Sequence, residues 1–158
     1  MKEKKAVILP GSYDPVTLGH LDMIRRAAEK YEEVYAVIFV NPEKTYKFSV
    51  DDRVKMLLLA TDEYENVLVS YSNGLVIDYM REHGIDTIIK GYRNDTDLEY
   101  EKRQAEWNKK HGGYDTLLWR SDDDLAHVSS TLARSKMSED ASLEGILPKP
   151  VIDFIKSR

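Results

Sequence analysis

Short apolar runs alternate with helical segments along the first two-thirds of the chain, and this alternation constrains the fold more than any other feature. The runs rich in strand-forming residues are 6–9, 34–40, 67–71, 87–90 and 116–119. Several of them lack polar alternation, as expected for parallel strands that are covered on both faces. The segments with helical composition are 21–31, 50–61, 75–83 and 97–110. Strand alternating with helix predicts an α/β fold with a Rossmann-like, doubly wound, parallel five-stranded sheet.

Capping residues support these helix boundaries. Ser49 precedes an acidic first turn and is the expected N-cap of the second helix. Thr96 and Glu99 have the spacing of a capping box at the start of the fourth helix. Gly84 is the expected stop of the third.

The rest of the chain, from Ser129 onward, has helical pieces interrupted by Pro148 and Pro150. No repeat or low-complexity linker divides the sequence, and 158 residues suffice for one domain with a proper core. We therefore expect a single domain, residues 1–158, with a helical C-terminal segment.

Composition narrows the class of protein. Hydrophobic residues make up 42% and charged residues 32%, which is typical of a soluble globular protein. The net charge of −5 argues against a general nucleic-acid binder. The chain has no cysteine, which excludes disulfides and thiolate chemistry. No apolar run has the length of a signal-peptide core or a membrane span, so we expect a cytoplasmic protein without membrane contact.

The turn between the first predicted strand and helix is the strongest functional signal. It has the sequence Gly-Ser-Tyr-Asp-Pro-Val-Thr-Leu-Gly-His, from Gly11 to His20. Backbone N–H groups, the positive end of a helix dipole and an imidazole converge there, which suits a phosphate. Gly11 lets the backbone approach a ligand closely, and Gly19 leaves room beside it.

Cations follow two other predicted strands. Lys44 and Lys47 lie after the second strand, where they can neutralise phosphate oxygens, although loop lysines are usually just solvated. Lys90 and Arg93 flank Gly91 at the end of the fourth strand. A guanidinium suits bidentate phosphate recognition, whereas lysine acts as a point charge. Because ligands of such sheets bind at the carboxyl ends of the strands, these cations are candidate phosphate ligands.

A fourth element is the hydroxyl run from Ser129 to Thr131, at the predicted start of a helix. These hydroxyls can cap the helix, or they can hold the outer phosphates of a nucleotide together with free N–H groups.

Taken together, the four elements resemble the bacterial phosphopantetheine adenylyltransferases, which belong to the nucleotidyltransferases with an HxGH or TxGH element. The TxGH element here is Thr17-Leu18-Gly19-His20. The family's Arg-Gly-Leu-Arg and Asp-Phe-Glu-Tyr-Glu segments are similar to residues 90–93 and 97–101. Its Ser-Ser-Ser/Thr element matches residues 129–131, and its proline-containing ending resembles residues 147–151.

The resemblance implies transfer of an adenylyl group from ATP to 4′-phosphopantetheine, which gives dephospho-coenzyme A and pyrophosphate. It implies that His20 is catalytic and stabilises charge at the α-phosphate. It implies that the acceptor is bound by Ser12, Lys44, Val76 and Lys90. The ATP contacts that it implies are Ser12, Tyr13, His20, Gly91, Tyr92, Arg93, Glu101, Leu125, Ala126, His127, Val128, Ser129, Ser130 and Thr131.

The resemblance also implies a homo-oligomer, a hexamer in this family, and Mg²⁺ that is bound mainly through nucleotide phosphates. No cluster of carboxylates predicts a metal site built by the protein itself. An acceptor phosphate with a second pKa near ~6 is largely dianionic at neutral pH, so the reaction needs positioning and charge stabilisation rather than a strong base.

Three features depart from the family pattern. Lys90 replaces the usual arginine, which removes bidentate capture of the acceptor phosphate. The three aspartates 122–124 would repel a triphosphate unless they point away or bind a cation. Trp107 replaces a usual methionine, and an atypical turn follows at 109–113. Two alternatives therefore stay open: a nucleotidyltransferase that uses CTP or another phosphorylated acceptor, and a nucleotide-binding paralogue without turnover.

Overall fold

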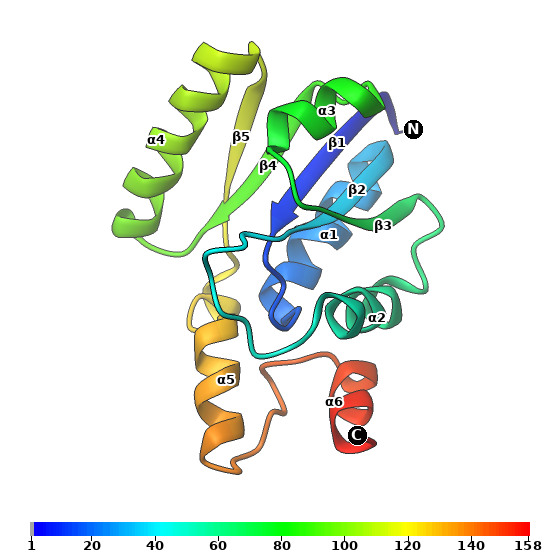
Figure 1. Ribbon diagram of the computed structural model, residues 1–158, viewed down its shortest axis with the longest axis vertical. Coiled ribbons are helices and arrows are strands. Elements are labelled where there is room, and N and C mark those ends of the chain that lie inside the picture. Colours follow the sequence, from blue (N-terminus) through cyan, green and yellow to red (C-terminus); the bar gives the residue numbers. More distant parts are fainter. Residues whose placement is uncertain (1) are drawn as a thin grey trace.

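The computed structural model describes residues 2–158, and within them five parallel strands form one sheet in the order β3-β2-β1-β4-β5 (Figure 1). The strands are β1 (Glu3–Gly11), β2 (Tyr31–Phe39), β3 (Val67–Ser72), β4 (Thr87–Tyr92) and β5 (Asp115–Arg120). In β1, Val7 pairs with Val34 of β2 on one side and with Thr87 of β4 on the other. The strand order therefore reverses at β1, as predicted for a doubly wound sheet, and a crevice opens there at the carboxyl ends of the strands.

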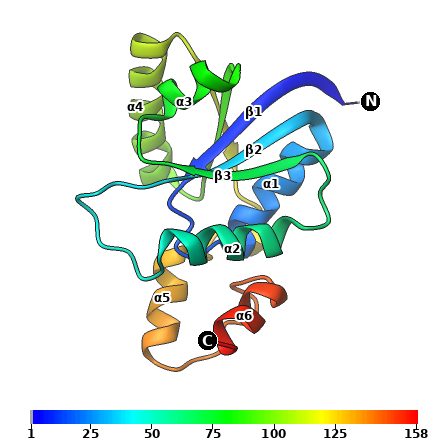
Figure 2. The same ribbon diagram turned by 45° about the vertical axis from the view of Figure 1, so that its right-hand side comes forward.

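Helices cover both faces of the sheet (Figures 1 and 2). The helices are α1 (Leu18–Lys30), α2 (Val50–Thr61), α3 (Val76–His83), α4 (Asp95–Gly112), α5 (Ser130–Ser138) and α6 (Lys149–Lys156), with a short 3₁₀ turn η1 (Asp123–Leu125). The pair α1 and α2 covers one face, and α3 and α4 cover the other. The predicted helical C-terminal segment is confirmed as α5 and α6, which lie beyond the carboxyl ends of the strands.

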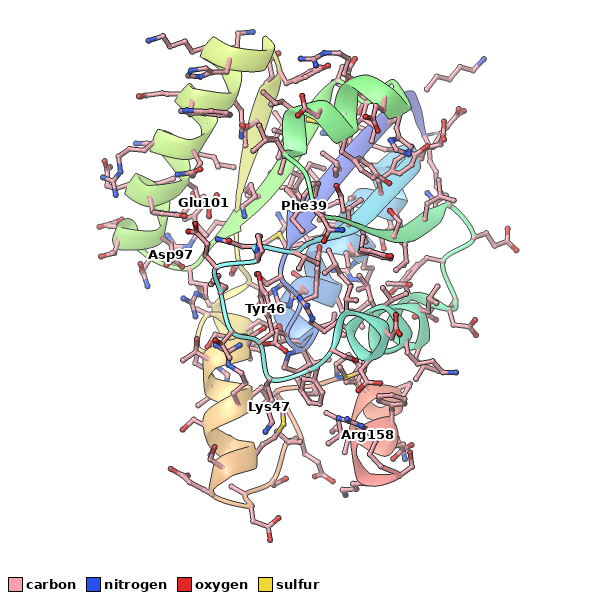
Figure 3. The ribbon with its side chains drawn as sticks, viewed as in Figure 1. Phe39, Tyr46, Lys47, Asp97, Glu101 and Arg158 are labelled. Atoms are coloured by element: carbon pink, nitrogen blue, oxygen red, sulfur yellow. The ribbon has the colours of Figure 1, made fainter. Side chains whose placement is uncertain are left out.

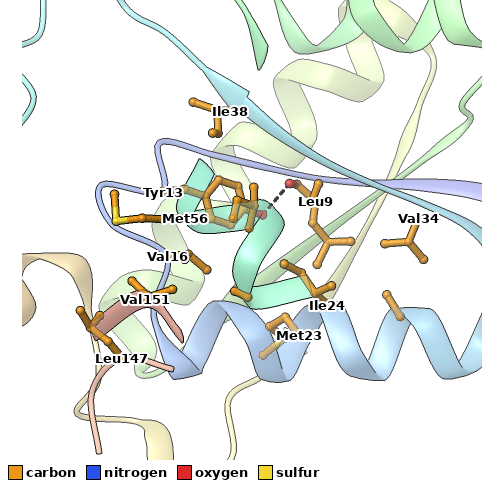
Figure 4. Close-up of a cluster of buried hydrophobic side chains, with 14 of the residues drawn as sticks. Leu9, Tyr13, Val16, Met23, Ile24, Val34, Ile38, Met56, Leu147 and Val151 are labelled. Atoms are coloured by element: carbon orange, nitrogen blue, oxygen red, sulfur yellow. Dashed lines mark hydrogen bonds between the residues drawn. The ribbon is translucent and has the colours of Figure 1, made fainter. Parts of the chain in front are cut away.

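Successive residues of β1 point to opposite faces of the sheet and enter two different cores. Val7 and Leu9 join the larger core, which includes Ile24 of α1 and Met56 of α2 (Figure 4). Ile8 points the other way and packs in the smaller core with Met80 of α3. Because both faces are buried, the strand has a continuous apolar sequence instead of an alternating one.

The first helix begins and ends earlier than predicted. The sequence pattern predicts a helix over 21–31, whereas α1 spans Leu18–Lys30 because Thr17 caps it through its side chain. Tyr31 is the first residue of β2 and is buried. The Tyr31 side chain fits both the helical spacing of α1 and a buried position in β2. The spacing of apolar residues therefore could not show where the helix ends and the strand begins.

The fourth helix also begins earlier than predicted. Its N-cap is Asn94, whose side-chain oxygen accepts the Asp97 N–H at 2.9 Å, so the predicted capping box at Thr96 is wrong. Asn94 has the extended backbone that a cap requires, while Thr96 already lies within the first turn. The caps predicted at Ser49 and Gly84 are confirmed: Ser49 accepts the Asp52 N–H, and Gly84 has φ +69°.

No helix in residues 2–158 combines the length and apolar character needed to cross a bilayer.

Candidate active site

The first βα turn is held in a defined shape by Tyr13. This residue has φ +48°, a left-handed conformation that non-glycine residues seldom adopt. Its hydroxyl donates a hydrogen bond to the Leu9 carbonyl oxygen at 2.7 Å, and the ring is buried in the larger core (Figure 4). A Cβ atom at Gly11 would lie 3.2 Å from that rigid ring. Glycine at 11 therefore allows Tyr13 to fold back against β1 and set the course of the turn.

His20 lies in the first turn of α1, and a reciprocal capping box fixes its imidazole. The Thr17 backbone N–H donates to His20 Nδ1 at 3.0 Å, and the His20 N–H donates to the Thr17 hydroxyl at 3.3 Å. Because a backbone N–H can only donate, Nδ1 is an acceptor and the neutral ring carries its proton on Nε2. The geometry thus provides a single imidazole N–H donor at the helix N-terminus.

The surroundings of His20 favour this neutral form. Burial lowers the pKa of His20 to about 4, and the positive charges of Lys90 and Arg93 act in the same direction. At neutral pH the side chain is therefore a neutral hydrogen-bond donor beside two cations. Such a donor stabilises developing negative charge without itself losing a proton.

A cleft of about 600 Å³ lies at the carboxyl ends of β1 and β4. It brings together twelve of the predicted site residues, which come from four separate segments of the chain. They are Ser12, Tyr13, His20, Lys44, Lys90, Gly91, Arg93, Glu101, Val128, Ser129, Ser130 and Thr131. The convergence of these segments makes the cleft the candidate active site.

Arg93 is oriented by a residue that the sequence analysis missed. Asp97 accepts hydrogen bonds from Arg93 Nε at 2.9 Å and from the Arg93 backbone N–H at 3.1 Å. The Arg93 guanidinium holds the pKa of the Asp97 carboxyl below its usual value. The four-residue spacing of Arg93 and Asp97 was the available signal, since such pairs meet where a helix begins.

Lys90 is paired with Glu101 of α4. Lys90 Nζ lies 3.6 Å from Glu101 Oε1, and Glu101 Oε2 is buried without a hydrogen-bond partner among residues 2–158. Burial raises the pKa of Glu101 more than Lys90 lowers it. Figure 3 shows Asp97 and Glu101 on the side of α4 that faces the middle of the molecule. Glu101 thus lines the cleft as a residue, while one of its oxygens stays buried without a donor.

A second cavity of about 210 Å³ adjoins the cleft. The two share Ser12, Lys90 and Glu101, so Lys90 stands at their junction. Val76, which the resemblance implies as an acceptor contact, lines this second cavity. Several residues of its wall were not indicated as site residues by sequence analysis, among them Phe39, Tyr100, Gln104, Asn108 and Thr116.

A hollow of similar volume, about 680 Å³, lies elsewhere and is electrostatically unsuited to a phosphate. It is lined by five glutamates: Glu29, Glu32, Glu33, Glu63 and Glu65. Their charges repel anions, whereas the cleft around His20 attracts them. Charge, and not size, identifies the candidate site.

Comparison with known proteins gives the family of this chain. Residues 8–136 match the model of a family described as cytidylyltransferase-like. A phosphopantetheine adenylyltransferase from Corynebacterium efficiens is 38% identical over 152 residues, covering 96% of each chain. One from Corynebacterium diphtheriae is 40% identical over 148 residues, covering 93% of each. The chain belongs to the phosphopantetheine adenylyltransferase family. It is a nucleotidyltransferase.

Four residues that the family resemblance implies as ATP contacts do not line either cavity: Tyr92, Leu125, Ala126 and His127. The Tyr92 carbonyl oxygen accepts the Ser121 N–H at 2.8 Å, which ties β4 to the segment after β5. Leu125 ends η1, and His127 is exposed beside the cleft. These four residues therefore do not form the walls of the candidate cleft.

The hydroxyl run has structural partners as well as a place in the cleft. Ser129 caps α5 by accepting the Leu132 N–H at 3.0 Å, and Ser130 donates to the Pro15 carbonyl oxygen at 2.7 Å. Thr131 accepts a hydrogen bond from Arg134 at 3.2 Å. The capping role expected of this run is confirmed for Ser129, and the same contacts fix the α5 N-terminus against the first turn.

The aspartates that depart from the family pattern do not line the cleft. Asp122 caps η1 by accepting the Asp124 N–H at 2.9 Å, and Asp123 lies 3.6 Å from Arg120. All three aspartates are exposed. Their charges face solvent, so they do not oppose a triphosphate at close range.

Proposed function

We propose that this chain transfers the adenylyl group of ATP to 4′-phosphopantetheine, with dephospho-coenzyme A and pyrophosphate as products. The observation that carries the proposal is the arrangement of His20, Lys44, Lys90 and Arg93 around one cleft. Two anionic molecules repel each other in water, and cations from separate segments offset that repulsion. The family relationship supports the same reaction.

In the proposed reaction, an oxygen of the acceptor phosphate attacks the α-phosphorus of ATP. A new P–O bond forms, and the bond from the α-phosphorus to the oxygen that bridges to the β-phosphorus breaks. The electron pair of that bond leaves with pyrophosphate. His20 donates its Nε2–H to an α-phosphate oxygen as negative charge gathers there. No proton has to leave the acceptor, because its phosphate is already largely dianionic.

We assign the two substrates to the two adjoining cavities. Lys44 and Lys90 would hold the acceptor phosphate, since Lys90 stands where the cavities join. The pantetheine arm would extend into the smaller cavity, along Val76 and Glu101. ATP would occupy the larger cleft, with Arg93 and the N-terminus of α5 near its outer phosphates.

Mg²⁺ fits this assignment as an ion that the nucleotide brings. Within residues 2–158 no three His, Asp or Glu side chains gather in a way that would hold a metal. The nearest carboxylates are engaged, Asp97 by Arg93 and one oxygen of Glu101 by Lys90. The metal would therefore be held mainly by phosphate oxygens and water, and it would supply charge neutralisation to the triphosphate.

The proposal extends to one domain over residues 1–158 that acts in the cytoplasm as a homo-oligomer, a hexamer by family resemblance. Apolar side chains exposed on α2, on the edge strand β3 and beyond it support self-association: Leu58, Leu68, Tyr71 and Leu75. Light scattering coupled to gel filtration measures the mass directly, and a monomeric mass would contradict this part.

The test of the reaction is pyrophosphate release with ATP or CTP, each with and without 4′-phosphopantetheine. We expect release only when ATP and the acceptor are both present. Release with CTP instead would favour another nucleotidyl transfer. Tight ATP binding without release under any condition would favour a nucleotide-binding protein that lacks turnover.

A further inference from the structure

Asp14 belongs to the first-turn motif but not to the walls of the cleft. Its side chain is only 4% exposed, and it is absent from the residues that line either cavity. Both carboxylate oxygens are used inside the protein. Oδ1 accepts the Phe48 N–H and Oδ2 accepts the Lys47 N–H, each at 2.9 Å. Asp14 therefore holds two consecutive peptide groups of a segment more than thirty positions away.

Arg53 ties the same segment from the other side. Its Nε donates to the Phe48 carbonyl oxygen and its Nη1 to the Ser12 carbonyl oxygen, both at 3.1 Å. The Arg53 side chain is buried, with the residue 2% exposed. The Phe48 N–H is thus bonded to Asp14, and the Phe48 carbonyl oxygen is linked to the Ser12 carbonyl oxygen through Arg53. These bonds restrict movement of the segment relative to the first turn.

Arg134 of α5 supports Asp14 in turn. Its Nη1 donates to the Asp14 carbonyl oxygen at 2.8 Å and lies 3.9 Å from Oδ2. A buried carboxylate is costly unless cations and donors surround it, and here two amides and a guanidinium do so. Asp14 of the first turn therefore contacts both segment 41–49 and α5.

Lys44 stands between the two fixed ends of segment 41–49. The Asn41 N–H donates to the Tyr46 hydroxyl at 2.9 Å, and the Lys44 N–H donates to the Asn41 carbonyl oxygen at 3.0 Å. The Tyr46 ring stacks on the Arg53 guanidinium at 4.1 Å. Figure 2 shows this segment reaching out beyond the ends of the strands, and Figure 3 places Tyr46 and Lys47 on it. Lys44 is exposed and has no ion pair of its own within residues 2–158.

We infer that Asp14 is a positioning residue that sets where Lys44 stands at the cleft, by fixing the peptide groups of Lys47 and Phe48. The inference rests on the proposed function for the role of Lys44, and on contacts within the chain for the role of Asp14. A direct role in metal or phosphate binding does not fit, because both oxygens already accept backbone hydrogen bonds away from the cleft walls.

The test is a double-mutant cycle on Asp14→Asn and Lys44→Ala. Asparagine keeps the size but places an NH₂ group opposite one backbone N–H and removes the charge. We expect each single variant to raise the KM for 4′-phosphopantetheine roughly tenfold, with the KM for ATP changed less than about twofold. In the Lys44→Ala background, Asp14→Asn should have no further effect on the acceptor KM, because the lysine that it positions is gone.

Ser49→Ala is the matched control for a general loss of stability. Ser49 ends the same segment and caps α2, but it does not touch Asp14. This variant should lower the midpoint of thermal unfolding and leave the acceptor KM within about twofold of wild type. If Asp14→Asn does not fold, Asp14→Glu replaces it in the cycle. That change keeps the charge but adds one methylene group, which moves the carboxylate relative to the Lys47 and Phe48 N–H groups.

Amide hydrogen exchange of residues 41–48 gives a readout that needs no substrate. In Asp14→Asn, or in Asp14→Glu, we expect faster exchange in this segment than in wild type or Ser49→Ala. Unchanged exchange, additive effects in the cycle, or equal increases in both KM values would overturn the inference. A wild type without acceptor-dependent pyrophosphate release would contradict the proposed function instead, and the exchange data would still decide whether Asp14 holds the segment.

Discussion

At the scale of single residues, the chemistry of this site depends on how neighbours restrict each side chain. The Thr17 backbone N–H selects the tautomer of His20, and Lys90 and Arg93 help to keep the ring neutral. Asp97 in turn holds the Arg93 guanidinium by two hydrogen bonds. The His20 imidazole is thus held as a neutral donor, and the Arg93 guanidinium is held in one orientation.

The protonation of His20 gives a prediction that needs no substrate. In an NMR titration its imidazole should change charge near pH 4 rather than near 6.5. The unfolded chain takes up this proton near pH 6.5, so it binds more protons than the folded chain between pH 6.5 and about 4. This residue's contribution to the free energy of unfolding is therefore present above pH 6.5 and is lost as the pH falls toward 4. A titration midpoint at or above 6.5 would contradict the neutral donor.

Replacement of the same side chain tests its role in turnover. His20→Asn should lower kcat about 10²–10³-fold, because a preorganised donor to the developing charge is lost. His111 is a matched control, since it is exposed at the end of α4 and stacks on Trp107 away from the cleft. His111→Asn should leave kcat within about twofold of wild type. A similar kcat in both variants would remove His20 from catalysis.

At the scale of elements, three helices begin next to the cleft, and their N-cap residues lie beside candidate binding residues. Thr17 caps α1 and presents His20, Ser129 caps α5 beside the first turn, and Asn94 caps α4 next to Arg93. Three helices therefore begin at the cleft, where unpaired N–H groups favour an anion.

The N-cap of α4 can be tested with a matched pair of variants. Asn94→Ala should lower the free energy of unfolding by about 1 kcal/mol, because the Asp97 N–H loses its acceptor. Thr96→Ala changes an exposed residue within the first turn and should have an effect below about 0.5 kcal/mol. Denaturant titration measures the unfolding free energy of both variants. A larger loss in Thr96→Ala than in Asn94→Ala would favour the capping box predicted at Thr96.

At the scale of the whole molecule, two cores on opposite faces fix the sheet, and the sheet fixes the cleft. The larger core continues from α1 and α2 into α5 and α6, so the C-terminal helices are anchored under the site. The molecule carries a net charge of −5, yet the cleft presents four candidate anion ligands. Attraction of anionic substrates is therefore a local property. Salt largely screens the interaction between exposed charges that lie more than a Debye length apart.

The larger core gives a stability prediction on α2. Met56 is fully buried and Lys55 is exposed, although both lie on the same helix. Met56→Ala should cost about 2–5 kcal/mol of unfolding free energy, because it leaves a cavity between α2 and the sheet. Lys55→Ala should cost less than about 0.5 kcal/mol. Comparable losses for the two variants would mean that α2 does not pack as described.

Most of the fold could be predicted from local patterns. Apolar runs such as that around Val7 to Leu9 specified parallel strands, and Ser49 and Gly84 specified helix ends, because capping and burial act over a few neighbouring residues. Tyr31 was assigned to the first helix because it satisfies the helical and the strand pattern equally well, and the N-cap of α4 is Asn94 instead of the predicted Thr96. Only its packing in the sheet assigns Tyr31 to β2.

The sequence by itself determined the alternation of strands and helices, and it indicated the first turn as the candidate phosphate site. The tertiary structure alone decided that Asp14 holds the peptides of Lys47 and Phe48, that Asp97 orients Arg93 and that Glu101 pairs with Lys90. It also decided which predicted residues line the cleft. These relations depend on side-chain directions and long-range contacts, which the crossover of the sheet creates and which no local spacing encodes.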